Sequence, residues 1–203
     1  MLARSSLIGG LFWCAALLAG TEVEAEVETT SALLAQQKIE EFHEKLLTVM
    51  QMTGGFDVRL AALSPVIHGL FDVTTIARIS LGRTWKTLDE SAQRTFIELL
   101  ERLIVVTYAA RFDKYSGQTF STMSSEQTRR GWVVKTELAL TDGDKVTLDY
   151  YLREGFVYNV VAEGVSDLSL RRADYNSIIK LEGYDALLAH ILENIAEQIP
   201  GDD

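Results

Sequence analysis

The chain has 203 residues, 47% of them hydrophobic and 24% charged, and its formal net charge is −10 at pH 7. Proteins that bind nucleic acid usually carry a basic face, and anionic membranes repel acidic proteins, so this charge argues against nucleic acid as a partner and against lasting membrane attachment. The length suits one domain with an ordinary hydrophobic core, and a single cysteine excludes a disulfide framework.

The first 25 residues have the pattern of a secretory signal peptide. An apolar run over residues 7–19 follows Arg4, and an acidic stretch over residues 22–28 comes after it. The run is about 13 residues long, whereas a helix needs roughly 20 to cross a bilayer. The bulk of the chain is therefore expected outside the cytoplasm.

Small residues after the apolar run offer points of cleavage. We favour cleavage after Ala25, with the region of Ala19 and Gly20 as the alternative, and an uncleaved anchor is the rival interpretation. Cys14 lies inside the apolar run. Cleavage would therefore leave a cysteine-free domain over residues 26–203.

The first half of the chain is predicted to be helical. Apolar residues recur at helical spacing over residues 31–52, and Thr53-Gly54-Gly55 ends this helix. A second helix is predicted over residues 58–71, with Pro65 inside it or at a break, and a third over residues 72–81.

A long helix is predicted from Thr87 to about Tyr115. The residues Thr87-Leu88-Asp89-Glu90 resemble a capping box with Thr87 as the N-cap. The first turns are amphipathic, but residues 103–110 contain no charged side chain. A helix that is apolar all round must be covered on every side, so this segment lies in the core or lines something apolar.

The period of the apolar residues changes to two after Ser116-Gly117, which indicates strands. They are predicted over residues 119–124, 132–140, 146–152 and 156–162. Two helices, over residues 170–180 and 184–198, are predicted to follow. The fold class is therefore α+β, with a helical layer packed on a four-stranded curved antiparallel sheet, in a single domain.

The sequence contains no motif for a metal, a phosphate loop or a catalytic nucleophile. His43, His68 and His190 lie on three separate predicted helices without a partner at ligand spacing. Asp149 and Glu163 are the candidate catalytic carboxylates, but Asp149 is predicted to face solvent and Glu163 lies at a strand end. We therefore expect no cofactor, no metal and no enzymatic activity.

Several blocks of sequence, in one order, resemble a known family. Residues 71–82, followed by Trp85, look like the "fDf..ia...LG..W" signature of the MlaC-type, toluene-tolerance auxiliary proteins of bacterial lipid transport. Residues 92–96, 107–109 and 115–117 continue the similarity at the family's spacing. The resemblance covers nearly the whole chain beyond the signal peptide.

The last part of the resemblance departs from the usual pattern. Residues 157–166 are similar to the family's "vyDv.veGvS" strand and turn, with Asn159 where many members have Asp. Residues 167–175 replace the usual "lv.nYr.qF", and this variant resembles the hopanoid-biosynthesis-associated branch most closely. These departures concern the ligand rather than the fold.

The resemblance implies a periplasmic carrier with an NTF2-like, cone-shaped fold around an apolar cavity. Such a carrier holds a phospholipid or a hopanoid-type lipid and exchanges it with an inner-membrane lipid transporter complex. The resemblance also implies that the protein is a monomer and contacts membranes only transiently. Two other classes stay open, namely a small cone-fold enzyme of the isomerase or dehydratase type acting on an apolar substrate, and a non-catalytic interaction module.

A lipid carrier needs a deep enclosed cavity. At roughly 0.8 kcal/mol per methylene, two acyl chains with about 30 methylenes would cost on the order of 25 kcal/mol to leave in water. The lipid headgroup would lie at the mouth of this cavity, where the candidates for contact with it are Arg83, Arg171 and Tyr175. The candidate lipid-binding residues are Phe71, Ile76, Leu81, Phe96, Leu100, Leu103, Ile104, Tyr108, Phe112, Trp132, Val134, Leu138, Leu148, Tyr150, Val160 and Tyr175.

Overall fold

The structure is a computed structural model that describes residues 18–201, with side-chain environments from residue 30 onward. Its elements are α1 (Leu18–Met50), α2 (Gly55–Leu70), α3 (Val73–Leu81), the 3-10 helix η1 (Thr84–Thr87), α4 (Glu90–Arg111), β1 (Thr119–Thr128), β2 (Gly131–Ala139), β3 (Lys145–Arg153), β4 (Phe156–Ala162), β5 (Val165–Ser166), α5 (Asp167–Glu182) and α6 (Tyr184–Gln198). Most of the predicted signal peptide, including Cys14, lies outside the described residues, and the predicted cleavage points fall in the first turns of α1.

The strands form one antiparallel sheet in the order β1-β2-β3-β4-β5, which confirms the predicted α+β class. The sheet has five strands rather than the predicted four. The additional strand, β5, has two residues and pairs with Val161 and Ala162 at the end of β4. A two-residue strand is too short to show an alternating pattern, so β5 could not be predicted from periodicity.

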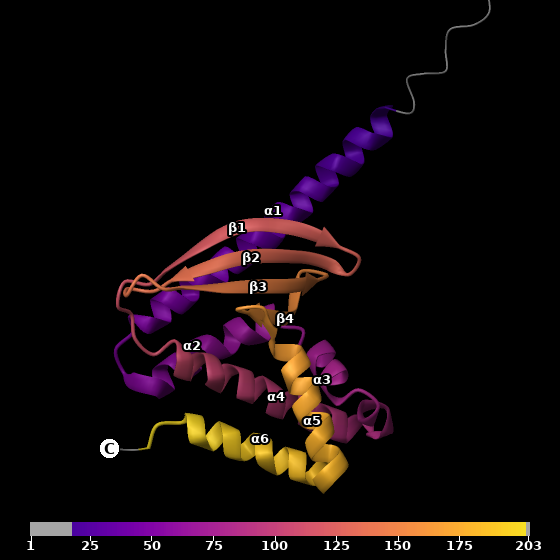
Figure 1. Ribbon diagram of the computed structural model, residues 1–203, viewed down its shortest axis with the longest axis vertical. Helices are drawn as coiled ribbons and strands as arrows, with labels where there is room; N and C mark the ends of the chain where they lie inside the picture. The colour runs from indigo at the N-terminus through magenta and orange to yellow at the C-terminus, as the bar shows by residue number, and fades with distance from the viewer. Residues whose placement is uncertain (1–17, 202–203) are drawn as a thin grey trace, which may run out of the picture.

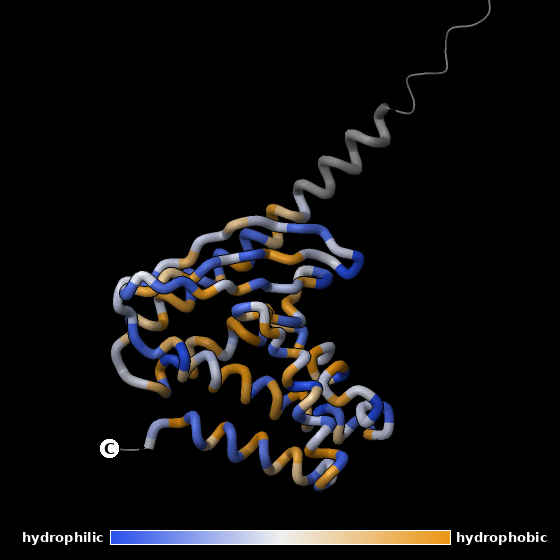
Figure 2. The backbone as a smooth tube through the Cα atoms, viewed as in Figure 1, coloured by the Kyte–Doolittle hydropathy of each residue, from blue (hydrophilic) through white to orange (hydrophobic). Residues whose placement is uncertain are grey.

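The sheet and the helices lie in layers (Figure 1). The curved sheet lies at one side, α1 runs along it, α2 and α4 lie beneath it, and α6 forms the outermost layer. The connection between β1 and β2 is hydrophilic, whereas α4 carries many hydrophobic positions (Figure 2). The core therefore lies between the sheet and the helical layer.

A side-chain cap begins α3, and a bridge to the sheet follows the end of α2. Asp72 is the N-cap of α3, and its side chain accepts a hydrogen bond from Thr75 N at 2.9 Å. Helix α2 runs through Pro65 without ending, and Phe71, just beyond it, bridges to Val157 in β4. This bridge ties the helical half of the chain to the sheet.

The ends of α4 differ from the prediction. The N-cap is Asp89, whose carboxylate accepts from Ala92 N at 2.8 Å, whereas the predicted N-cap, Thr87, belongs to η1. The helix ends at Arg111 instead of Tyr115. No helix within residues 18–201 combines the length and the apolar character needed to cross a membrane.

Candidate functional site

An apolar cavity of about 320 Å³ lies between the second half of α4 and the inner face of the sheet. This volume is in the range of small-molecule binding sites. The lining is also typical of such sites, because apolar and aromatic side chains predominate over a few polar groups. The lining residues are Phe71, Ile76, Ile104, Thr107, Tyr108, Arg111, Phe112, Leu138, Val146, Leu148, Tyr150, Tyr158, Asn159, Val160, Ala162, Asp167, Leu168 and Arg171.

An aromatic cluster supports one wall of the cavity. Phe42, from α1, packs edge-on against Phe71, Tyr108 and Tyr150, with ring centroids 5.8, 5.4 and 6.1 Å away. Phe42 is buried and does not line the cavity. It therefore holds three lining rings in place from behind, since edge-to-face aromatic pairs have a preferred geometry.

A buried histidine orients one of these rings. His43 Nε2 lies 3.0 Å from the hydroxyl of Tyr150, and the imidazole stacks on Phe120 with centroids 3.9 Å apart. Burial lowers the pKa of His43 to about 4, and burial also raises the pKa of the Tyr150 hydroxyl. Near neutral pH the pair is therefore an uncharged hydrogen bond beside the cavity.

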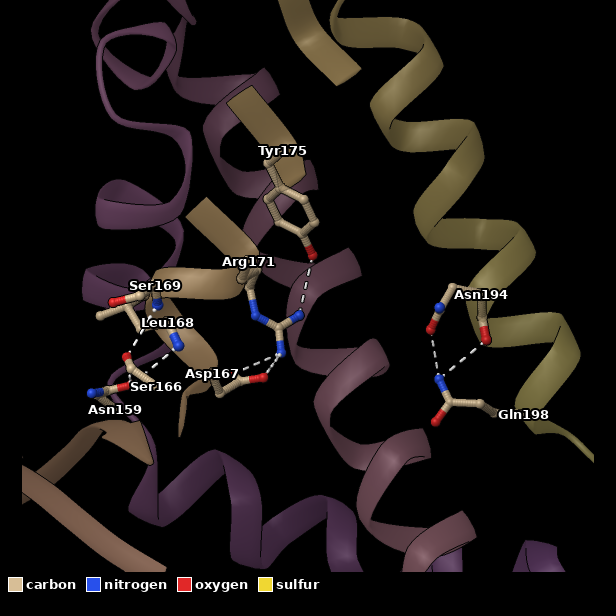
Figure 3. A network of polar contacts seen from close by, with 9 residues as sticks. All are labelled: Asn159, Ser166, Asp167, Leu168, Ser169, Arg171, Tyr175, Asn194 and Gln198. Carbon is tan, nitrogen blue, oxygen red and sulfur yellow. Dashed lines mark hydrogen bonds and ion pairs between the residues drawn. The ribbon is translucent and has the colours of Figure 1, made fainter. Parts of the chain in front are cut away.

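Asp167 and Arg171, at the start of α5, line the cavity. Figure 3 shows the polar contacts that they make. Arg171 Nη2 donates to both carboxylate oxygens of Asp167, at 3.1 and 2.9 Å, and Nη1 donates to the Tyr175 hydroxyl at 3.1 Å. The four-residue spacings place these side chains on one face of the helix. Arg171 Nε is buried and has no hydrogen-bond partner among the described residues.

Asn159 fastens the start of α5 to the sheet. Its Oδ1 accepts hydrogen bonds from Ser166 Oγ and from Leu168 N, each at 3.1 Å. Ser166 Oγ in turn caps α5 by accepting from Ser169 N. An asparagine oxygen accepts hydrogen bonds as a carboxylate oxygen does, so an Asp at this position could accept the same two bonds.

A second, more polar pocket of about 500 Å³ adjoins the apolar cavity, between α4, α5 and α6. Thr107, Arg111, Asp167 and Arg171 line both spaces. The other lining residues of this polar pocket are Leu103, Leu170, Asp174, Tyr175, Ile178, Leu187, His190, Ile191, Asn194 and Gln198. The apolar cavity and the polar pocket therefore share a boundary of polar side chains.

The structure brings many of the predicted lipid-binding residues together around the cavity. Those that line it are Phe71, Ile76, Ile104, Tyr108, Phe112, Leu138, Leu148, Tyr150 and Val160. Leu103 and Tyr175 line the polar pocket instead. Of the headgroup candidates, Arg171 lines both spaces, whereas Arg83 lines neither.

The remaining predicted residues do not line the cavity. Leu81, Phe96, Leu100 and Val134 are completely buried in the packed core, and Trp132 is half-buried against it. Sequence period identifies the buried face of an element, but it does not distinguish a side chain that meets other atoms from one that meets a void.

Sequence reasoning missed several lining residues, among them Thr107, Arg111, Tyr158 and Asp167. A signal existed for one of them, since Asp167 and Arg171 have the i, i+4 spacing of a helical ion pair. No comparable local pattern marks Arg111, which lies in the last turn of α4.

The two candidate catalytic carboxylates lie away from both pockets. Asp149 is opposite Lys135 in the register of β2 and β3, half-buried, and burial raises its pKa. The exposed Glu163 carboxylate accepts from the backbone N–H and the hydroxyl of Thr147, which lowers its pKa. Both residues therefore have structural surroundings rather than a place at the cavity.

The histidines do not form a metal site within the described residues. His68 Nδ1 lies 2.9 Å from Glu101 on the surface, and His190 Nε2 lies 3.3 Å from Glu182. Each histidine therefore has its own separate partner.

Comparisons with known proteins agree with this geometry. A family model described as MlaC protein matches residues 36–193. The chain is similar in structure to the phospholipid-binding protein from Ralstonia solanacearum in complex with a phospholipid, with 18% sequence identity and a TM-score of 0.71 over 83% of this chain and 98% of that chain. At this identity the likeness establishes a shared fold. No curated protein matches the chain.

Proposed function

Since this chain belongs to the MlaC family, we propose that it is a lipid-binding protein that encloses the acyl part of a phospholipid between α4 and the sheet. The observation that carries this proposal is the apolar cavity of about 320 Å³, bounded by Ile104, Leu148 and Val160 among others. Burial of apolar surface there offsets the cost of taking acyl chains out of a membrane. The phospholipid bound to the Ralstonia protein of the same fold supports this class of ligand.

In the proposed function the protein binds its ligand and does not catalyse a reaction on it. A carboxylate that acts as a general base needs an oxygen free to take a proton from the substrate. Asp167 is the one carboxylate among the described lining residues, and both its oxygens accept hydrogen bonds from Arg171. This engagement favours a binding protein over an isomerase or a dehydratase.

The proposed setting is the periplasm, where the protein acts as a monomer that carries lipid to or from an inner-membrane transporter complex. The signal-peptide pattern of residues 1–25 supports export. Among the side chains of α1 that the structure describes, the first buried one is Ala35, which lies beyond the predicted cleavage points. A hopanoid-type lipid is the alternative cargo.

Solvent extraction of the protein purified from its native host tests the carrier function. Mass spectrometry of the extract should detect close to one equivalent of a phospholipid, or of a hopanoid-type lipid, and thus identify the cargo. Protein that was never exposed to membrane lipid serves as the control. An extract without lipid, from folded protein, would favour an interaction module instead.

Sequencing of the N-terminus tests export. The protein recovered from the periplasmic fraction should begin at Glu26, which corresponds to cleavage after Ala25. Full-length protein confined to the cytoplasm would contradict the proposed location.

A further inference from the structure

We infer that Arg111 and Arg171 bind the phosphate of a lipid whose headgroup occupies the polar pocket between α4, α5 and α6. This inference rests on the proposed function, and it adds a headgroup site and a preference for lipids that carry a phosphate. The evidence is the position of these guanidinium groups at the boundary of two spaces of opposite character.

The geometry of the two spaces suits an amphiphile. The apolar cavity is lined mainly by aliphatic and aromatic side chains, whereas the polar pocket presents Asp174, His190 and Asn194. The two spaces share Arg111 and Arg171. A molecule with acyl chains in the first space and a headgroup in the second would therefore place its phosphate next to both arginines.

Arg111 has hydrogen-bonding capacity that the protein leaves unused. It is exposed at the end of α4 and forms no hydrogen bond or ion pair with any described residue. A guanidinium group offers five N–H donors in a planar fork, which matches the oxygens of a phosphate. Arg111 can therefore bind an anion without first breaking an internal contact.

Arg171 also retains a donor. Two of its nitrogens are held by Asp167 and Tyr175, but its buried Nε has no partner within the described part of the chain. A buried unsatisfied donor costs free energy, and a ligand oxygen that reached Nε would recover that cost. The Asp167 contact meanwhile holds the guanidinium group in one orientation.

The described arginines and aspartates around the two spaces balance in number, whereas the whole protein is acidic. The described charged residues that line the apolar cavity are two arginines and one aspartate, and Asp174 adds a second carboxylate on the side of the polar pocket. The whole chain carries −10. The overall field therefore disfavours anionic ligands, so any preference for a phosphate has to come from close contacts at this boundary.

Competition between two lipids tests the headgroup site. The protein is incubated at physiological salt with vesicles that contain phosphatidylglycerol and diacylglycerol with the same acyl chains, and the lipid it retains is extracted and quantified. The wild type should prefer phosphatidylglycerol. Arg111→Gln should reduce this preference about tenfold, because it removes a charge-assisted hydrogen bond.

Matched variants make the test specific. Arg102→Gln changes the net charge equally on an exposed position of the same helix, away from both pockets, and should leave the preference unchanged. Arg111→Lys keeps the charge and should keep most of the preference. Inorganic phosphate should not displace the lipid, and displacement would indicate a free-anion site instead.

Two failures are distinguishable. Equal retention of both lipids by the wild type, or an Arg111→Gln variant with unchanged preference and unchanged thermal stability, would overturn the headgroup site alone. Retention of neither lipid by the wild type would overturn the carrier function as well.

Discussion

His43 is a histidine that the fold holds neutral between α1 and the sheet. It is only 3% exposed, and its ring lies against Phe120 and beside the Tyr150 hydroxyl. Burial lowers its pKa from 6.5 to about 4. A proton on this ring would place a charge in an apolar layer that borders the cavity.

Acidification should destabilise the protein through His43. Above about pH 6.5 the imidazole is neutral in both the folded and the unfolded protein, so its contribution to stability is complete. Between pH 6.5 and 4 the unfolded chain binds a proton at His43 that the folded protein does not bind. The free energy of unfolding should fall by about 3 kcal/mol over this window. Urea unfolding of the wild type and of His43→Gln, measured across that window, checks this. The difference between the two curves should shrink as the pH falls, and parallel curves would contradict the assignment.

The partner of His43 could not be predicted from the sequence. The pattern of residues 31–52 correctly predicts a helix, and a core or surface role for the histidine follows from the lack of a metal motif. Tyr150, however, lies 107 positions further along the chain. Only the fold brings the two side chains together, since no local pattern encodes a contact at that separation.

At the scale of elements, the start of α4 shows how local chemistry decides between neighbouring candidates. Asp89 and Thr87 are both good N-cap residues, but the chain from Thr84 to Thr87 forms a 3-10 turn in which Thr87 Oγ1 donates to Thr84 O. The Thr87 side chain is therefore engaged within this turn. The Asp89 carboxylate accepts the hydrogen bond from Ala92 N and caps α4.

Substitution of the cap distinguishes the two residues. Asp89→Ala should lower the free energy of unfolding by about 1 kcal/mol, because it leaves a backbone N–H of the first turn without an acceptor. Thr87→Ala, which removes an exposed hydrogen bond within η1, should cost less than half of that. Chemical denaturation measures both. A larger effect for Thr87→Ala would restore the capping box that the sequence suggests.

The helices and longer strands could be predicted because each repeats a pattern over several residues. The change from helical spacing to alternation after Ser116 marks the start of the sheet correctly. The end of α4 was harder to predict, since the apolar period of residues 103–110 gives no stop signal. The helix ends four residues early, which places Arg111 and Phe112 beside the cavity.

The cavity is a property of the whole molecule, because α4 passes through two environments. Phe96, in its first half, packs against Tyr175 and Tyr184 at 6.0 and 6.3 Å between ring centroids. Ile104 and Tyr108, in its second half, face the hollow beneath the sheet. The same apolar period runs through both halves, so the sequence predicts an apolar helix but not where its neighbours leave space.

Substitution of an alanine by phenylalanine tests whether the cavity is open in solution. The same change is made at one alanine that lines the cavity and at one in the packed core. Ala162 lines the cavity from β4, whereas Ala109 is completely buried in the packed core on α4. Ala162→Phe should place its ring in the hollow and lower the lipid retained after exposure to vesicles, with little change in the free energy of unfolding. Ala109→Phe should cost about 1–3 kcal/mol or more, because a packed interior cannot accept the ring without strain. Equal destabilisation by the two substitutions would mean that the hollow is closed in solution, and a carrier with a closed interior has no room for an acyl chain.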